Sequence, residues 1–116
     1  MNKVQRTCDA SSIDTICHVV ELPPMCPVSG NPAGGSLRIE YSPARGVVLD
    51  VDDIAAEIHL YVGGRGEVRD MERTIQRLAE WAAGVVGALV AVRADMEITT
   101  VPESSQRMVV TCERRP

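Results

Sequence analysis

The clearest pattern in the chain is a strict alternation of apolar and polar residues from Val90 to Thr100, which is typical of a strand with one buried face. Residues 37–42 alternate in the same way, and a last strand is predicted at residues 106–113. The run of residues 13–22 is rich in β-branched side chains and predicts a further strand. This strand should end at Pro23 and Pro24, because proline has no N–H to donate to a sheet.

A short apolar run, residues 47–49, follows a turn at Pro43 to Gly46. Strands joined by such a short turn commonly pair with each other. Residues 37–42 and 47–49 are therefore predicted to form a hairpin.

Apolar residues recur at steps of three and four between the strand pairs, which is the spacing of amphipathic helices. The first helix is expected to be capped by Asp50 or Asp52 and to be closed by Gly63, Gly64 and Gly66. Its apolar face is expected to consist of Val51, Ile54, Ala55, Ile58 and Val62.

A second, longer helix has the apolar positions Met71, Ile75, Leu78, Ala82, Val85 and Leu89. Asp70 and Glu72 lie near its N-terminus, where the helix dipole favours negative charge. Gly84 and Gly87 weaken its last turns, so the helix is expected to end before Leu89.

The predicted order is strand, strand, helix, helix, strand, strand, with room for one more strand at the start. This order predicts an α+β fold, an antiparallel sheet with two helices on one face. The 116 residues are enough for one domain. Residues 1–12 show no periodicity and are expected to be a mobile leader, with residues 13–116 as the single domain.

The composition of the chain argues against two classes of partner, nucleic acids and membranes. The net charge is −4 and the chain has no basic cluster, so a nucleic acid is not expected as a partner. The longest apolar run, residues 82–92, is shorter than the roughly 20 residues of a membrane span, and residues 1–14 do not resemble a signal peptide. A cytoplasmic protein with no membrane partner is therefore expected. With one Trp, two Tyr and no Phe, a flat ligand would find few aromatic partners within one subunit.

The four cysteines Cys8, Cys17, Cys26 and Cys112 are expected to be reduced thiols, because no export signal accompanies them. None is spaced as Cys-x-x-Cys, and the two histidines are distant from them in sequence. No metal site is expected.

Cys26 is the residue with the strongest candidate chemistry. It lies in the stretch from Met25 to Ser36, where three glycines and two prolines forbid a regular element. In such a loop the backbone geometry can fix the position of a side chain. From position alone, Cys26 is either a nucleophile or a small apolar residue under a loop.

The string Cys26-Pro27-Val28-Ser29-Gly30-Asn31-Pro32 resembles the active-site loop of the QueF family, the nitrile reductases that make 7-aminomethyl-7-deazaguanine on the way to queuosine. Tyr41-Ser42-Pro43 falls at the distance where that family has its x-Tyr-x-Pro, and the resemblance covers about Cys26 to Ile98. It implies a tunnelling fold (T-fold). In this fold, ββααββ subunits join their sheets into a barrel and bind planar purine or pterin rings between subunits. A homo-oligomer with a deazapurine-like small molecule as its ligand is the corresponding expectation.

The resemblance implies that Cys26 attacks a nitrile carbon to give a covalent thioimidate. A thiolate is nucleophilic enough for this reaction near neutral pH. Asp70 and Arg69 align with the Glu and His that hold the substrate in the family, with Glu72 as the alternative to Asp70, and Ser29 is a further substrate-binding candidate.

Two departures from the family change the expected activity. Ala33 stands where the family has the aspartate that protonates the nitrile nitrogen. The segment from Asp50 to Ala55 replaces the lysines of the NADPH segment with an aspartate and an alanine, so NADPH is disfavoured and no cofactor is expected.

The leading hypothesis is a cysteine-dependent enzyme that acts on a 7-cyano-7-deazaguanine-type nitrile and resolves the thioimidate with water or an amine. One alternative is a non-catalytic ring-binding or assembly protein. Others are an NADPH-dependent reductase with a diverged cofactor segment and a different T-fold reaction on a pterin-like or unrelated acceptor.

Overall fold

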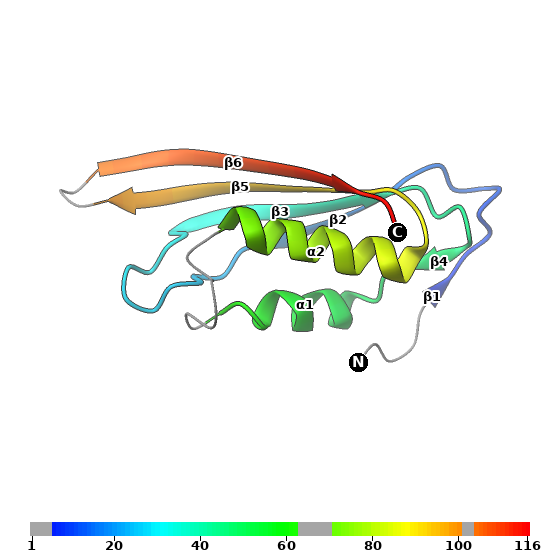
Figure 1. Cartoon of the computed structure of the whole chain (residues 1–116), viewed down its shortest axis with the longest axis horizontal. Helices are drawn as coiled ribbons and strands as arrows, with labels where there is room; N and C mark the ends of the chain where they lie inside the picture. The colour runs from blue at the N-terminus through cyan, green and yellow to red at the C-terminus, as the bar shows by residue number, and fades with distance from the viewer. Residues whose placement is uncertain (1–5, 63–70, 101–103) are drawn as a thin grey trace.

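The computed structural model describes residues 6–62, 71–100 and 104–116 of the chain (Figure 1). Its elements are, in order, β1 (Arg6–Thr7), β2 (Ile16–Glu21), β3 (Gly34–Tyr41), β4 (Val47–Val48), α1 (Val51–His59), α2 (Met71–Val86), β5 (Val90–Thr100) and β6 (Ser104–Arg114). The main sheet has the strand order β2-β3-β5-β6, and every neighbouring pair in it is antiparallel. A second sheet contains β1 and β4.

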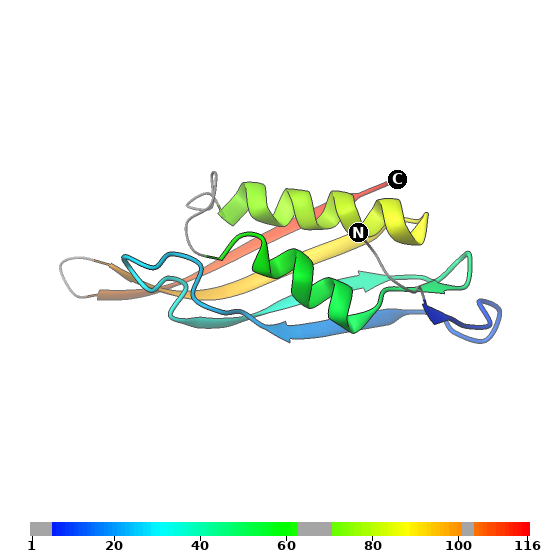
Figure 2. The same ribbon diagram turned by 90° about the horizontal axis from the view of Figure 1, so that it is seen from below.

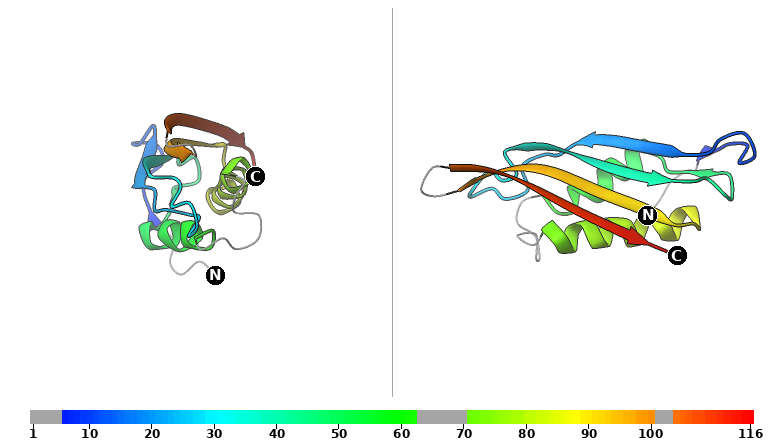
Figure 3. Two further views of the ribbon diagram at one scale, coloured as in Figure 1. Left: turned by 90° about the vertical axis from the view of Figure 1, so that its left-hand side faces the viewer. Right: turned by 90° about the horizontal axis from the view of Figure 1, so that it is seen from above.

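Both helices lie against the same face of the main sheet (Figure 2). No described element covers the opposite face of the sheet, which faces the viewer in the right-hand view of Figure 3. The left-hand view looks along the molecule from one end and shows the strands and the helices as two layers. The predicted α+β fold with two helices on one face of an antiparallel sheet is therefore confirmed, and the described elements are compatible with a ββααββ arrangement. Neither helix in the described ranges is long and apolar enough to cross a membrane.

The predicted hairpin of residues 37–42 with 47–49 is wrong. β3 has β2 on one edge and β5 on the other, so neither edge is available to β4. β4 pairs instead with β1, where Arg6 is opposite Val48 and Thr7 is opposite Val47. Residues 6–7, within the segment predicted as a leader, thus form a strand of the small sheet.

The strand bounds differ from the prediction by three residues at the start of β2, which begins at Ile16, and at the start of β3, which begins at Gly34. The first two residues of β3, Gly34 and Gly35, belong to the stretch predicted as a loop. Gly35 has a φ of +141°, and a Cβ built on it would lie 2.2 Å from the backbone oxygen of Asp95. A glycine here lets β3 approach β5 more closely than any side chain would allow.

The N-terminus of α1 is capped by Asp50, one of the two predicted alternatives. Its carboxylate accepts hydrogen bonds from the N–H groups of Asp52 at 3.0 Å and Asp53 at 3.2 Å. α1 ends at His59, before the glycines expected to close it, which lie outside the described residues. α2 ends at Val86, as predicted, and Gly87 follows it with a φ of +67°.

The core lies between the helices and the main sheet. From β3 and β5 it receives Leu37, Ile39, Tyr41, Val90, Val92, Ala94 and Met96. From α2 it receives Met71, Ile75, Leu78, Ala79, Ala82, Ala83 and Val86. The three alanines among them are fully buried, and their small side chains let α2 lie close to the sheet.

The buried face of α1 is narrower than predicted. Ile54 and Ile58 are buried, whereas Val51 is 55% exposed and Ala55 is exposed as well. Most of the core is therefore formed by α2 and the sheet.

Candidate functional site

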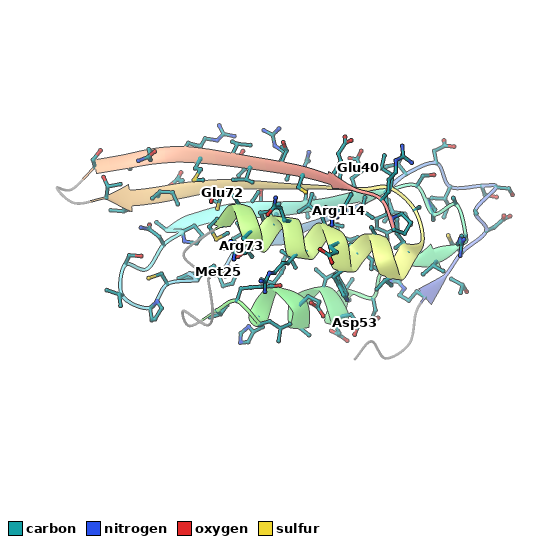
Figure 4. The ribbon with its side chains drawn as sticks, viewed as in Figure 1. Met25, Glu40, Asp53, Glu72, Arg73 and Arg114 are labelled. Atoms are coloured by element: carbon teal, nitrogen blue, oxygen red, sulfur yellow. The ribbon has the colours of Figure 1, made fainter. Side chains whose placement is uncertain are left out.

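A pocket of about 400 Å³ lies at the end of the molecule where α2 begins. Three segments that are distant in the sequence line it, namely the loop before β3, the first turn of α2 and the paired strands β5 and β6. The lining residues are Met25, Cys26, Val28, Ser29, Asn31, Pro32, Met71, Glu72, Ile98 and Met108. Figure 4 labels Met25 and Glu72 at this end of the molecule.

The loop that carries Cys26 is closed by its own backbone. The N–H groups of Met25 and Cys26 both donate to the carbonyl oxygen of Asn31, at 2.9 and 3.0 Å. The carbonyl of Cys26 accepts a hydrogen bond from the N–H of Gly30 at 2.8 Å, and Gly30 has a φ of +71°. These bonds hold Cys26 half-buried at the edge of the pocket, with Met25 beside it almost fully buried.

Three of the predicted site residues come together in this pocket. Cys26 and Ser29 line it from the loop, and Glu72 lines it from α2. The hydroxyl oxygen of Ser29 also accepts a hydrogen bond from the N–H of Asn31 at 3.2 Å. The other two predicted substrate-binding residues, Arg69 and Asp70, lie outside the described residues.

Glu72 contributes the one carboxylate among the described residues that line the pocket. It is exposed and lies in the first turn of α2, where negative charge is favoured by the helix dipole. Ala33 is exposed and donates its N–H to the carbonyl of Glu97 at 2.7 Å, and its methyl group cannot transfer a proton.

The remaining walls of the pocket are mostly apolar. Met25, Met71 and Met108 contribute thioether side chains, and no aromatic ring is among the described lining residues. Methionine side chains adapt to the shape of what they contact. A flat ligand in this pocket would therefore lie against aliphatic and thioether groups, in keeping with the scarcity of aromatic residues in the chain.

The segment Asp50 to Ala55 does not fit a cofactor phosphate. It forms the cap and first turns of α1, where the carboxylate of Asp50 already accepts the N–H groups that an anion would use. Asp53 is also buried there, and its Oδ2 has no hydrogen-bond partner among the described residues. Negative charge at this helix end opposes the binding of a phosphate.

The residues that could ligate a metal do not gather in the part of the chain that the structure describes. No group of three or more His, Cys, Asp or Glu side chains is arranged to hold a metal ion there. None of the four cysteines forms a disulfide.

Sequence reasoning missed the role of Asn31 in this site. Its side-chain amide forms two hydrogen bonds with the backbone of Thr99, which is 68 residues away. An asparagine after a glycine is an ordinary turn signal, so no local pattern distinguishes this residue.

The chain was compared with protein-family models, curated proteins and solved structures, and none of them matched it.

Proposed function

We propose that this protein uses Cys26 to form a covalent thioimidate with the nitrile of a 7-cyano-7-deazaguanine-type small molecule. The observation that supports this most directly is that Cys26 shares one pocket with Ser29 and Glu72. A nucleophile, a hydroxyl group and a carboxylate are what a ring with N–H donors and a nitrile substituent would need around it.

In the proposed reaction the Cys26 thiolate adds to the nitrile carbon. A carbon–sulfur bond forms, the carbon–nitrogen triple bond becomes a double bond, and the nitrogen takes up the proton that the Cys26 thiol released when it ionised. Water or an amine then adds to the same carbon and the thiolate leaves, so that the nitrile becomes an amide or an amidine. Neither outcome transfers a hydride, and the segment that would bind NADPH does not fit a phosphate.

In this proposal, the carboxylate of Glu72 accepts hydrogen bonds from the N–H edge of the ring. It is the described carboxylate that lines the pocket, and a bidentate hydrogen bond from an N–H edge to a carboxylate gives orientation as well as affinity. Ser29 could hydrogen-bond to the ring or to the nitrile nitrogen from the loop side.

The T-fold is also part of this proposal. The sequential order β2-β3-β5-β6 with both helices on one face supports it. The two outer strands, β2 and β6, have one edge each that no strand of the described chain pairs with, and such edges are available to the same strands of further copies. A barrel of several copies would extend the pocket with residues from a neighbour.

The test is the intact mass of the protein after incubation with 7-cyano-7-deazaguanine. The expected result is a mass increase equal to one ligand, which Cys26→Ala abolishes and Cys112→Ala retains. Cys112 is the matched control because it is also half-buried but lies on β6 and is not among the residues that line the pocket. NADPH should not be oxidised in the same mixture.

Absence of the adduct and of any amide or amidine product, in a protein that still binds the ligand, would contradict the reaction. It would favour the alternative of a ring-binding module. The observation that favours this alternative is Ala33, whose methyl group cannot protonate the nitrile nitrogen, while Glu72, the one carboxylate among the described lining residues, is assigned to the N–H edge of the ring.

A further inference from the structure

The side chain of Asn31 extends the hydrogen bonding between β3 and β5 beyond Gly34, the first residue of β3. The register of these strands ends at Gly34 opposite Glu97, and Ala33 adds one bond to the carbonyl of Glu97. Two residues further along β5, the N–H of Thr99 donates to Oδ1 of Asn31 at 2.9 Å. Nδ2 of Asn31 donates to the carbonyl of Thr99 at 2.8 Å.

Asparagine is suited to this place because its amide has the donor and the acceptor of a peptide group. Both backbone groups of a residue in an antiparallel strand point to the same side, so one side-chain amide can satisfy the two groups of Thr99 together. An aspartate has the same shape but lacks the donor, and it would place an oxygen against the carbonyl of Thr99.

The same residue also holds the loop of Cys26. The backbone carbonyl of Asn31 accepts the N–H groups of Met25 and Cys26, while its side chain is bound to β5. Asn31 therefore joins the loop to the paired strands that carry Ile98 and Met108, which also line the pocket. If this link is broken, the loop and the strands can move relative to each other.

We propose that Asn31 is a positioning residue, whose side chain sets the place of the Cys26 thiol relative to the Ile98 and Met108 wall. This inference deepens the proposed function and rests on it for the chemical step. The geometric part, that Asn31 restrains Cys26, does not depend on any ligand.

The experiment compares the wild type with Asn31→Asp in two reactions of Cys26. With iodoacetamide, a small reagent that needs no alignment, alkylation of Cys26 should accelerate at least about tenfold because the loop opens more often. Alkylation of Cys112 should change by less than about twofold, because β6 remains paired. With saturating 7-cyano-7-deazaguanine, formation of the adduct should slow at least about tenfold, since a misplaced nucleophile reacts slowly with a bound ligand.

Thr99→Val is the matched control. The side-chain amide of Asn31 bonds to the backbone groups of Thr99, and the side chain of Thr99 is exposed, so valine should leave both rates within about twofold of the wild type. Asn31→Gln keeps the amide with one more methylene and should change both rates in the same directions as Asn31→Asp but less. It also provides the test if Asn31→Asp does not fold.

A folded Asn31→Asp protein with unchanged rates in both reactions would overturn the inference. Equal acceleration at Cys26 and Cys112 would do so as well, because it would indicate a general loss of structure. If the wild type forms no adduct, the proposed function fails, and the selective alkylation of Cys26 still decides whether Asn31 restrains it.

Discussion

The Nε2 atom of His18 lies 2.8 Å from the hydroxyl of Tyr41, and the two rings stack with their centroids 5.6 Å apart. The same hydroxyl accepts a hydrogen bond from the N–H of Leu49 at 2.8 Å. Since that oxygen accepts from Leu49, its own proton is available to a neutral His18. The contact joins β2 and β3 to the chain segment that leads into α1.

A fall in pH should lower the free energy of unfolding of the protein, because His18 becomes protonated. Partial burial, followed by the positive charge of Arg6, lowers the pKa of His18 below 6.5. The unfolded chain then binds this proton more readily than the folded one, so the contribution to stability is complete above pH 6.5 and decreases as the pH falls below it. Urea unfolding at about pH 7.5 and about pH 5.5 measures the loss, and His18→Gln should lose less than the wild type. Equal losses in the two proteins would show that His18 does not contribute.

Tyr41→Phe should destabilise the protein by about 1–3 kcal/mol, because it leaves the N–H of Leu49 without its acceptor in a buried place. The variant keeps the ring, so the packing of the core is retained. Chemical denaturation at neutral pH provides the measurement. A loss close to zero would mean that another group or a water molecule takes over the bond to Leu49.

Asp50→Ala should cost about 1 kcal/mol, because the cap of α1 loses its acceptor for two N–H groups. The matched control is Asp52→Ala, whose side chain is exposed in the first turn and interacts favourably with the helix dipole, with an expected cost of about 0.3–1 kcal/mol. The difference between the two free energies of unfolding isolates the cap. A larger loss for Asp52→Ala would mean that the cap has been assigned to the wrong residue.

Gly35→Ala should destabilise the protein by about 3 kcal/mol, the upper end of the usual range for overpacking. The reason is the added Cβ, which would lie 2.2 Å from the backbone oxygen of Asp95. Gly34→Ala is the matched control in the same strand, because a Cβ at Gly34 meets nothing within 4 Å, and it should cost less than about 0.5 kcal/mol. Thermal unfolding of both variants distinguishes them, and similar midpoints would contradict the close approach of β3 to β5.

Glu72→Gln should weaken the binding of 7-cyano-7-deazaguanine about tenfold or more, since a charge-assisted hydrogen bond becomes a neutral one. The fold should be retained, because the side chain of Glu72 is exposed. Calorimetric titration measures the affinity, with Glu80→Gln as the control on the same helix, far from the pocket lining. Equal affinities for the wild type and Glu72→Gln would remove Glu72 from the proposed site.

Local patterns in the sequence predict most of the secondary structure of this chain. The strands around Ile39, Val92 and Val110 alternate because one face of the main sheet lies under the helices. The end of α2 follows from its glycines. The pairing of β4 with β1 could not be predicted, because it depends on which edges of β3 are already occupied.

The candidate site was predictable only in part, for a similar reason. Cys26 and Ser29 are close in the sequence, and their loop is recognisable from its glycines and prolines. Glu72 reaches the same pocket only because α2 packs across the sheet with Met71 buried at its start. The hydrogen bonds between Asn31 and Thr99 depend on the register of β3 with β5. This register cannot be predicted from a local pattern in the sequence.

The strands β5 and β6 continue past the end of β3, and this overhang has a consequence for how a ligand would affect the protein. Among the described residues, Thr99 in the outermost part of the overhang is hydrogen-bonded to the loop before β3 through the side chain of Asn31 and not through a strand backbone. The overhang should therefore open by local unfolding more often than the core. A ligand that touches Cys26, Glu72 and Met108 at once would act as a cross-link between loop, helix and overhang. Hydrogen exchange at the overhang should then slow on binding by much more than exchange in the core, whatever chemistry follows.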